Sequence, residues 1–130
     1  MATGFPAATG DILTAAMFNG LTAFQSTITD QTADYTAVLT DQYQVLVSMN
    51  KATAIAFKIP TNASVAFPVG TVLNVLSKGA GLVTISAVTP ATTTILSAGA
   101  VAASPTLAQY KMAACVKVAT DTWYVVGAIA

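Results

Sequence analysis

Carboxylates are the first place to look for chemistry, because this chain has no histidine and its five acidic residues are all aspartates. Asp30, Asp34 and Asp41 fall in one polar stretch. A calcium loop needs oxygen ligands at closer spacing, as in D-x-D-x-D-G, and the intervals here are four and seven. A glycoside hydrolase would need a pair, Asp30 with Asp34 or Asp30 with Asp41. The spacing favours solvated loop carboxylates over either site.

Nucleophiles and phosphate-binding motifs give no stronger signal. A serine nucleophile needs a nearby base, and the sequence has neither a histidine nor a G-x-S-x-G pattern. Gly79 and Gly81 lack the third glycine of a dinucleotide-binding loop and predict a turn. Cys115 is the single cysteine and lies in an apolar run, which predicts a buried, unreactive thiol. We therefore expect no catalytic residue, no metal site and no cofactor, so the protein is predicted not to be an enzyme.

Aromatic residues leave a carbohydrate-binding platform as an alternative. Such a platform would use exposed tryptophan and tyrosine side chains. Trp123 and Tyr124 are adjacent in an apolar strand-like segment, so their side chains should point to opposite faces. We expect one of the two to lie in the core.

The composition points to assembly rather than to a freely diffusing domain. The 130-residue chain is 55% apolar and 8% charged, with a formal net charge of zero, whereas an average domain has about 25% charged residues. Nucleic-acid binding and attachment to anionic membranes are therefore not expected. The longest charge-free run, between Lys78 and Lys111, is too rich in Gly, Pro, Ser and Thr for a membrane span, and the N-terminus has no secretory signal pattern. The shortage of charge predicts that much of the surface packs against copies of this chain or against another protein.

Residues 1–34 are predicted to form an extended N-terminal arm with a short helix over Ala15–Asn19, extending to about Ser26. Apolar residues recur there at intervals of three and four, which places them on one helical stripe. This stripe is a candidate interface, although the same spacing suits a helix packed on its own sheet. Thr29–Asp34 is polar and is expected to be a loop. The stripe consists of Leu13, Met17, Leu21, Phe24 and Ile28.

Residues 35–130 are predicted to form a β-rich domain, because apolar residues there alternate with a period of two between turn signals. Short strands at regular spacing indicate an all-β fold, specifically an antiparallel β-sandwich or a barrel-like domain behind the arm and helix. Trp123–Val126 should close a hairpin after a tight turn. The predicted strands are Tyr43–Met49, Thr53–Ile59, Val65–Val69, Val72–Leu76, Leu82–Ala87, Thr94–Ser97, Leu107–Met112, Ala114–Val118 and Trp123–Val126.

Two segments resemble proteins of bacteriophage particles. The first, Gly10–Leu21, is similar to the G-x-x-L-T-A-A-x-x-N segment of many phage tail-fibre and virion proteins. The second, Tyr35–Ala130, resembles a β-rich module of phage structural proteins. The stretches that carry this second likeness are Tyr35–Asp41, Met49-Asn50, Ile59–Thr71, Gly79-Ala-Gly81, Val83–Ile85, Val116–Trp123 and Gly127.

The resemblance implies a non-enzymatic virion structural protein, commonly a homotrimer. Tail-fibre modules usually belong to much longer chains, and we expect these 130 residues to act without a long shaft. That favours a small capsid decoration or cement protein on the capsid surface, which would stabilise the head shell and bind the major capsid protein or other virion proteins. The alternative is a tail or tail-fibre component that takes part in assembly or binds a host receptor.

Overall fold

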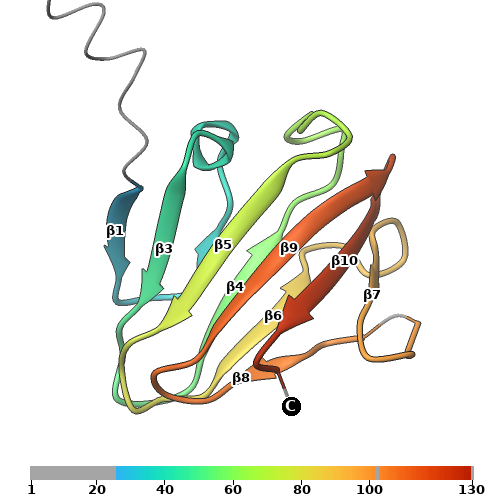
Figure 1. Cartoon of the computed structure of the whole chain (residues 1–130). Coiled ribbons are helices and arrows are strands. Elements are labelled where there is room, and N and C mark those ends of the chain that lie inside the picture. Colours follow the sequence, from blue (N-terminus) through green and yellow to red (C-terminus); the bar gives the residue numbers. More distant parts are fainter. Residues whose placement is uncertain (1–25, 102, 130) are drawn as a thin grey trace, which may run out of the picture.

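The computed structural model describes residues 26–101 and 103–129, and over these residues the chain is all-β (Figure 1). The one helical element in this part is a short 3-10 turn, η1, at Leu39–Gln42. No helix among the described residues is long and apolar enough to cross a membrane. The strands are β1 Thr27–Gln31, β2 Tyr35–Thr36, β3 Val45–Met49, β4 Ile55–Ile59, β5 Val72–Ser77, β6 Val83–Ala87, β7 Thr94–Leu96, β8 Thr106–Leu107, β9 Met112–Ala119 and β10 Thr122–Gly127.

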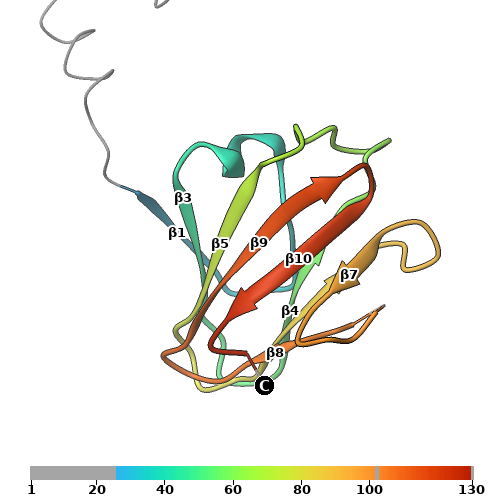
Figure 2. The same ribbon diagram turned by 45° about the vertical axis from the view of Figure 1, so that its right-hand side comes forward.

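The strands form two mixed sheets, and the chain passes back and forth between them. The larger sheet has the order β1-β3-β5-β9-β10-β7, and the smaller one has the order β2-β4-β6-β8. β1, β3 and β5 are parallel neighbours in the larger sheet, as are β2, β4 and β6 in the smaller one. Successive turns of the chain therefore stack on one another, and Figure 2 shows the two sheets as separate layers.

The predicted antiparallel arrangement is wrong for much of the chain. A polar linker between two segments of alternating apolar and polar residues is compatible with a hairpin, but it is equally compatible with a crossing to the other sheet. Residues 50–54, which join β3 to β4, can span about 16 Å, and packed sheets lie only about 10 Å apart. The link between β9 and β10 is much tighter, with Asp121 at a positive φ of 53°. The hairpin predicted there is confirmed, since these two strands are antiparallel neighbours.

The stacking of successive turns explains the glycines of residues 79–81. The backbone N–H of Gly81 donates to the carbonyl of Lys51 at 2.9 Å, and that of Asn50 donates to the carbonyl of Gln31 at 2.8 Å. These bonds join each loop to the loop one turn earlier in the chain. A Cβ atom on Gly81 would overlap the backbone carbonyl of Thr53. The predicted reversal of the chain is present, and close approach between two loops is the reason for its glycine.

One hydrophobic core takes its side chains from alternate positions of both sheets. Trp123 and Phe57 are its largest fully buried members. Phe67 packs edge-on against Trp123, with ring centroids 5.6 Å apart. Burying a large apolar side chain contributes about 1.5–3 kcal/mol. The whole cluster consists of Ala37, Val47, Met49, Ile55, Phe57, Ile59, Phe67, Leu73, Val75, Val83, Ile85, Ile95, Leu107, Ala113, Cys115, Trp123 and Val125.

Two of the predicted strands are absent or broken, for local reasons. Val65–Val69 contains no strand, because the backbone N–H of Val65 bonds to the carbonyl of Thr61 in a turn. Leu107–Met112 divides between β8 and β9, because a turn at residues 108–111 interrupts it, with Tyr110 at a positive φ of 66°. The other predicted strands all overlap observed ones.

Most of the N-terminal predictions fall outside the described residues. Leu13, Met17, Leu21 and Phe24 lie there, as does the helix predicted over residues 15–19. Ile28 is described, and it lies in strand β1 rather than on a helix. The loop predicted at Thr29–Asp34 is also wrong in part. Its first three residues complete β1, which pairs in parallel with β3, and a β-branched pair at 28 and 29 suits that strand.

Candidate interaction surface

Most outward positions of the six-stranded sheet carry apolar side chains. The inward side of the sheet is identified by fully buried apolar residues, such as Leu73 and Val75 in β5 and Val125 in β10, and the register extends this assignment to the neighbouring strands. Side chains alternate along a strand, so the remaining positions face outward. We define the apolar face as the apolar residues at these outward positions, namely Ile28, Leu46, Val72, Leu76, Leu96, Met112, Ala114, Val116, Val118, Tyr124 and Val126.

The strand register brings these side chains into continuous rows. Val72 of β5, Val116 of β9 and Tyr124 of β10 are direct neighbours across three strands. Tyr124 is 47% exposed and Val126 is 52% exposed. Large apolar side chains that are about half exposed and adjacent to one another form a patch, and such patches mark interaction sites more often than single exposed residues do.

The smaller sheet provides an internal comparison. The same alternation places Thr36, Lys58 and Ser86 on its outward side, and the register aligns these positions across β2, β4 and β6. Thr84 and Thr106 also face outward there as direct neighbours, and Thr84 lies next to the small side chain of Ala56. The smaller sheet therefore carries mainly hydroxyl groups outward, whereas the outward side of the larger sheet is mostly apolar. The polar outward positions of the larger sheet are Asp30, Ser48, Asn74, Thr94 and Thr122. The apolar excess of the composition is concentrated on one side of the molecule.

An open hollow of about 250 Å³ borders the apolar face at its β7 edge. It is lined by residues 96–101 and by Tyr124, Val125 and Val126. Ala98 and Gly99 give it a small-residue wall, and both adopt positive φ angles of 50° and 81°. A hollow that continues an apolar surface can accept one large side chain of a partner, as central anchor residues at interfaces require.

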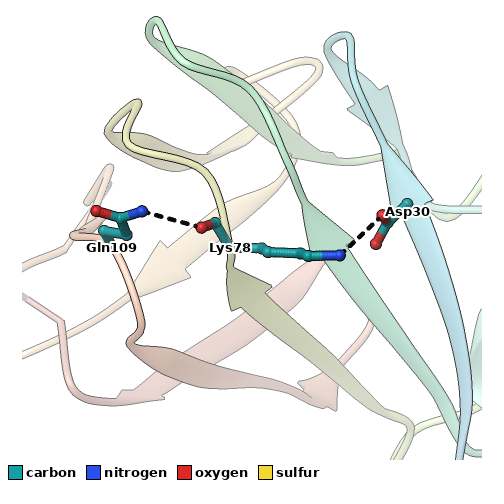
Figure 3. Close-up of polar contacts among 3 residues, drawn as sticks. All are labelled: Asp30, Lys78 and Gln109. Atoms are coloured by element: carbon teal, nitrogen blue, oxygen red, sulfur yellow. Dashed lines mark hydrogen bonds and ion pairs between the residues drawn. The ribbon is translucent and has the colours of Figure 1, made fainter.

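Towards the β1 edge of this sheet, a cluster of three polar residues extends from β1 past the end of β5 to the turn before β9. The Nζ atom of Lys78, just after β5, lies 3.2 Å from Oδ2 of Asp30 in β1, and Gln109 donates to the Lys78 carbonyl at 3.2 Å (Figure 3). The Ser48 hydroxyl and the Lys78 ammonium hold the pKa of Asp30 below its ordinary value. Both charged side chains are about half exposed, so this pair is a polar rim to the apolar face and adds little stability.

The aspartates considered for chemistry have separate structural roles. Asp34 accepts the backbone N–H of Ala56 at 2.9 Å. Asp41 accepts the hydroxyl of Tyr35 at 2.7 Å and the backbone N–H of Val38 at 2.9 Å. The expectation of a solvated carboxylate is wrong for Asp41, which is buried because it ties down η1. Among residues 26–101 and 103–129, no group of three potential ligands is placed to hold a metal ion.

Two other single-residue predictions are confirmed. Cys115 is fully buried, and its burial raises the pKa of the thiol to about 12. Trp123 is in the core, whereas Tyr124 points outward.

Ser48 and Lys51 have the S-x-x-K spacing of some serine enzymes, a motif that was not recognised in the sequence. Residues three apart lie on the same side of a helix but not of a strand, and Ser48 is a buried residue of β3. The spacing therefore does not bring Ser48 and Lys51 together as it would in a helix.

The apolar face itself was also missed, although the sequence contains a signal for it. Tyr124-Val125-Val126 and Cys115-Val116 are apolar at both inward and outward positions. Strands that are buried on both sides have this continuous apolar pattern.

Comparisons with protein-family models, with curated proteins and with solved structures found no match to this chain.

Proposed function

We propose that this protein is a non-enzymatic virion structural protein, a capsid decoration or cement protein that stabilises the head shell as an oligomer. The apolar face is the observation that carries the proposal, because it is a large side of the molecule unsuited to water. The virion setting rests on the resemblance of Gly10–Leu21 and Tyr35–Ala130 to phage structural proteins. We also propose that the two sheets form a sandwich.

A second copy of the chain is the proposed occupant of the apolar face. Six strands about 4.8 Å apart, each about five residues long, give a flat face of roughly 500 Å². A stable interface buries about 800 Å² on each partner. The side chains corrugate the face, and the bordering hollow adds to it. Its outward positions carry one charged residue, Asp30, which is already paired with Lys78. Like-charge repulsion between copies is therefore small, as the formal net charge of zero also requires.

A pair of matched variants tests the oligomer. Val126→Asp places a carboxylate in the apolar face, and Thr84→Asp places one at an outward position of the smaller sheet. Light scattering after size exclusion should show an oligomer for the unmodified chain and for Thr84→Asp, and a monomer for Val126→Asp. A folded, monomeric unmodified chain at high concentration would refute self-association through this face.

The position in the particle needs a separate experiment. Gold-labelled antibodies against the protein should decorate the head, and particles without the protein should lose integrity on heating or osmotic shock. Labelling of the tail would refute the decoration role and favour the tail alternative. Particles that withstand heat and shock equally well without the protein would refute a cementing role.

A further inference from the structure

Lys117 is a buried lysine that the proposed assembly does not use. It lies in β9 and points inward opposite Trp123, its neighbour across the hairpin. The residue is only 2% exposed. Its Nζ atom donates to Oδ1 of Asn62 at 2.6 Å and to the backbone carbonyl of Phe67 at 2.7 Å. The nitrogen of the lysine side chain is thus held against the side-chain amide of a residue 55 positions away in sequence.

Both acceptors of the Lys117 amine, the side-chain oxygen of Asn62 and the backbone carbonyl of Phe67, are neutral. Within the described part of the chain, the one lysine with a carboxylate inside 4.0 Å is Lys78. A buried ammonium without a counter-ion is costly, because the interior cannot replace its hydration. Converting the amine to an amide removes this cost, since an amide is neutral and still donates one hydrogen bond.

The surroundings hold the two groups together in a largely dry site. Asp121 accepts the backbone N–H of Asn62 at 2.7 Å and the hydroxyl of Thr93 at 3.2 Å, and so fixes the loop that carries Asn62. Trp123 is the cross-strand neighbour of Lys117, and the ring of Phe67 packs edge-on against Trp123. Asn62 itself is half-buried, which leaves a route for a small leaving group.

We propose that Lys117 and Asn62 form an intramolecular isopeptide bond. The Nζ atom of Lys117 attacks the Cγ atom of Asn62, and the new Nζ–Cγ bond replaces the bond between Cγ and Nδ2. Nζ loses one proton before the attack, which frees its electron pair, and a second proton after it. The departing Nδ2 takes up both protons and leaves as an ammonium ion. A lysine ammonium and a primary amide thus become a secondary amide and an ammonium ion. No oxidant, metal or second substrate takes part.

The bond would join the loop after β4 to the middle of β9. It would close a covalent ring across both sheets and restrict the unfolded chain, as other cross-links do over long sequence separations. The bond is internal to one chain and does not depend on assembly. Its absence would leave the proposed function untouched, and a monomeric protein could still contain it.

Intact mass of the purified, unlabelled full chain tests the proposal. The unmodified protein should be lighter than its sequence by one ammonia, and proteolysis should yield one branched peptide that joins Lys117 to Asn62. Lys117→Met and Asn62→Ala should show the full mass of their sequences. Lys58→Met, which removes an outward-facing lysine of β4, should still lose ammonia. A folded unmodified protein at full mass would overturn the bond.

Two further variants separate this chemistry from its alternatives. A succinimide at Asn62 also releases ammonia, and it would persist in Lys117→Met, so loss of ammonia in that variant overturns the proposal. Asp121 is a positioning residue, because it contacts the backbone of Asn62 and not the reacting atoms. Asp121→Asn keeps an oxygen acceptor and should complete the bond, whereas Asp121→Ala should complete it more slowly. Equal rates in these two variants would remove Asp121 from the proposed mechanism.

Discussion

Replacing Gly81 with alanine tests the stacking of successive turns, the feature that most distinguishes this fold from an antiparallel one. The added Cβ would overlap the backbone of Thr53, one turn earlier in the chain. Backbone atoms cannot rotate away as a flexible side chain can. In an antiparallel arrangement of neighbouring hairpins, these two loops would have no reason to meet, and the methyl group would be tolerated.

The expected loss is about 2 kcal/mol in the free energy of unfolding. Overpacking costs about 1–3 kcal/mol, and overlap with backbone atoms that cannot move aside places this case at the upper end of that range. The alanine also restricts the unfolded chain, and at a compatible backbone conformation this returns about 0.4–1 kcal/mol. Gly81 is not among the glycines with positive φ, so the return applies. For a domain of this size, such a loss lowers Tm by roughly 6–12 °C.

Urea and thermal unfolding followed by circular dichroism would measure this loss. Ala80→Ser is the matched control, because Ala80 is exposed in the same bend and a surface change there should stay within about 0.5 kcal/mol. The reasoning is refuted if Gly81→Ala is as stable as this control, because the loops of successive turns would then not be in contact.

Three further perturbations address the core, the site of η1 and the face. Burial raises the pKa of Cys115 to about 12, so the contribution of this thiol to the free energy of unfolding is complete below pH 9 and is lost as the pH rises towards 12. Urea unfolding across this pH range should show a decline in stability that Cys115→Ala lessens. A thiol reagent should label Cys115 only after the protein unfolds. Tyr35→Phe removes a hydrogen bond to the buried Asp41 and should cost about 1–3 kcal/mol, whereas Tyr43→Phe, at an exposed site, should cost nothing measurable by the same unfolding assay. Ile28→Asp should leave Tm unchanged, because Ile28 is 64% exposed, but should weaken the oligomer in light scattering; a marked fall in Tm would instead mean that Ile28 packs within its own chain.

The strands were predictable because burial on one side leaves a period of two in the sequence. Ile55, Phe57 and Ile59 alternate with less buried residues in β4, as the sequence indicated. Their partners were not predictable, because a turn signal marks where a strand ends and not which strand follows beside it. The same local pattern at residues 50–54 and at residues 120–121 leads to a crossing in one case and to a hairpin in the other.

The candidate surface was predictable in kind but not in place. The low charge content predicted that part of the surface contacts other protein. The spacing of apolar residues, however, placed the predicted interface on the helical stripe that ends at Ile28. The apolar face draws residues from strands far apart in sequence, such as Val72 and Tyr124, and only the register brings them together. Lys117 was hidden for a related reason. In the sequence, a lysine between two valines is expected to face solvent. Only the burial pattern of β9 shows that this lysine points inward.

The apolar face is a property of this sequence and not a consequence of the fold. Both sheets contain parallel neighbours, and parallel sheets are usually covered on both sides. The smaller sheet nevertheless carries threonine, serine and lysine on its outward side, which shows that this coiled topology tolerates contact with water. Nothing in the backbone therefore required Val116 and Val126 to be apolar. Because the outward hydroxyl groups of β6 would serve equally well on β9 and β10, the difference between the two sheets supports the proposal that a partner covers only one of them.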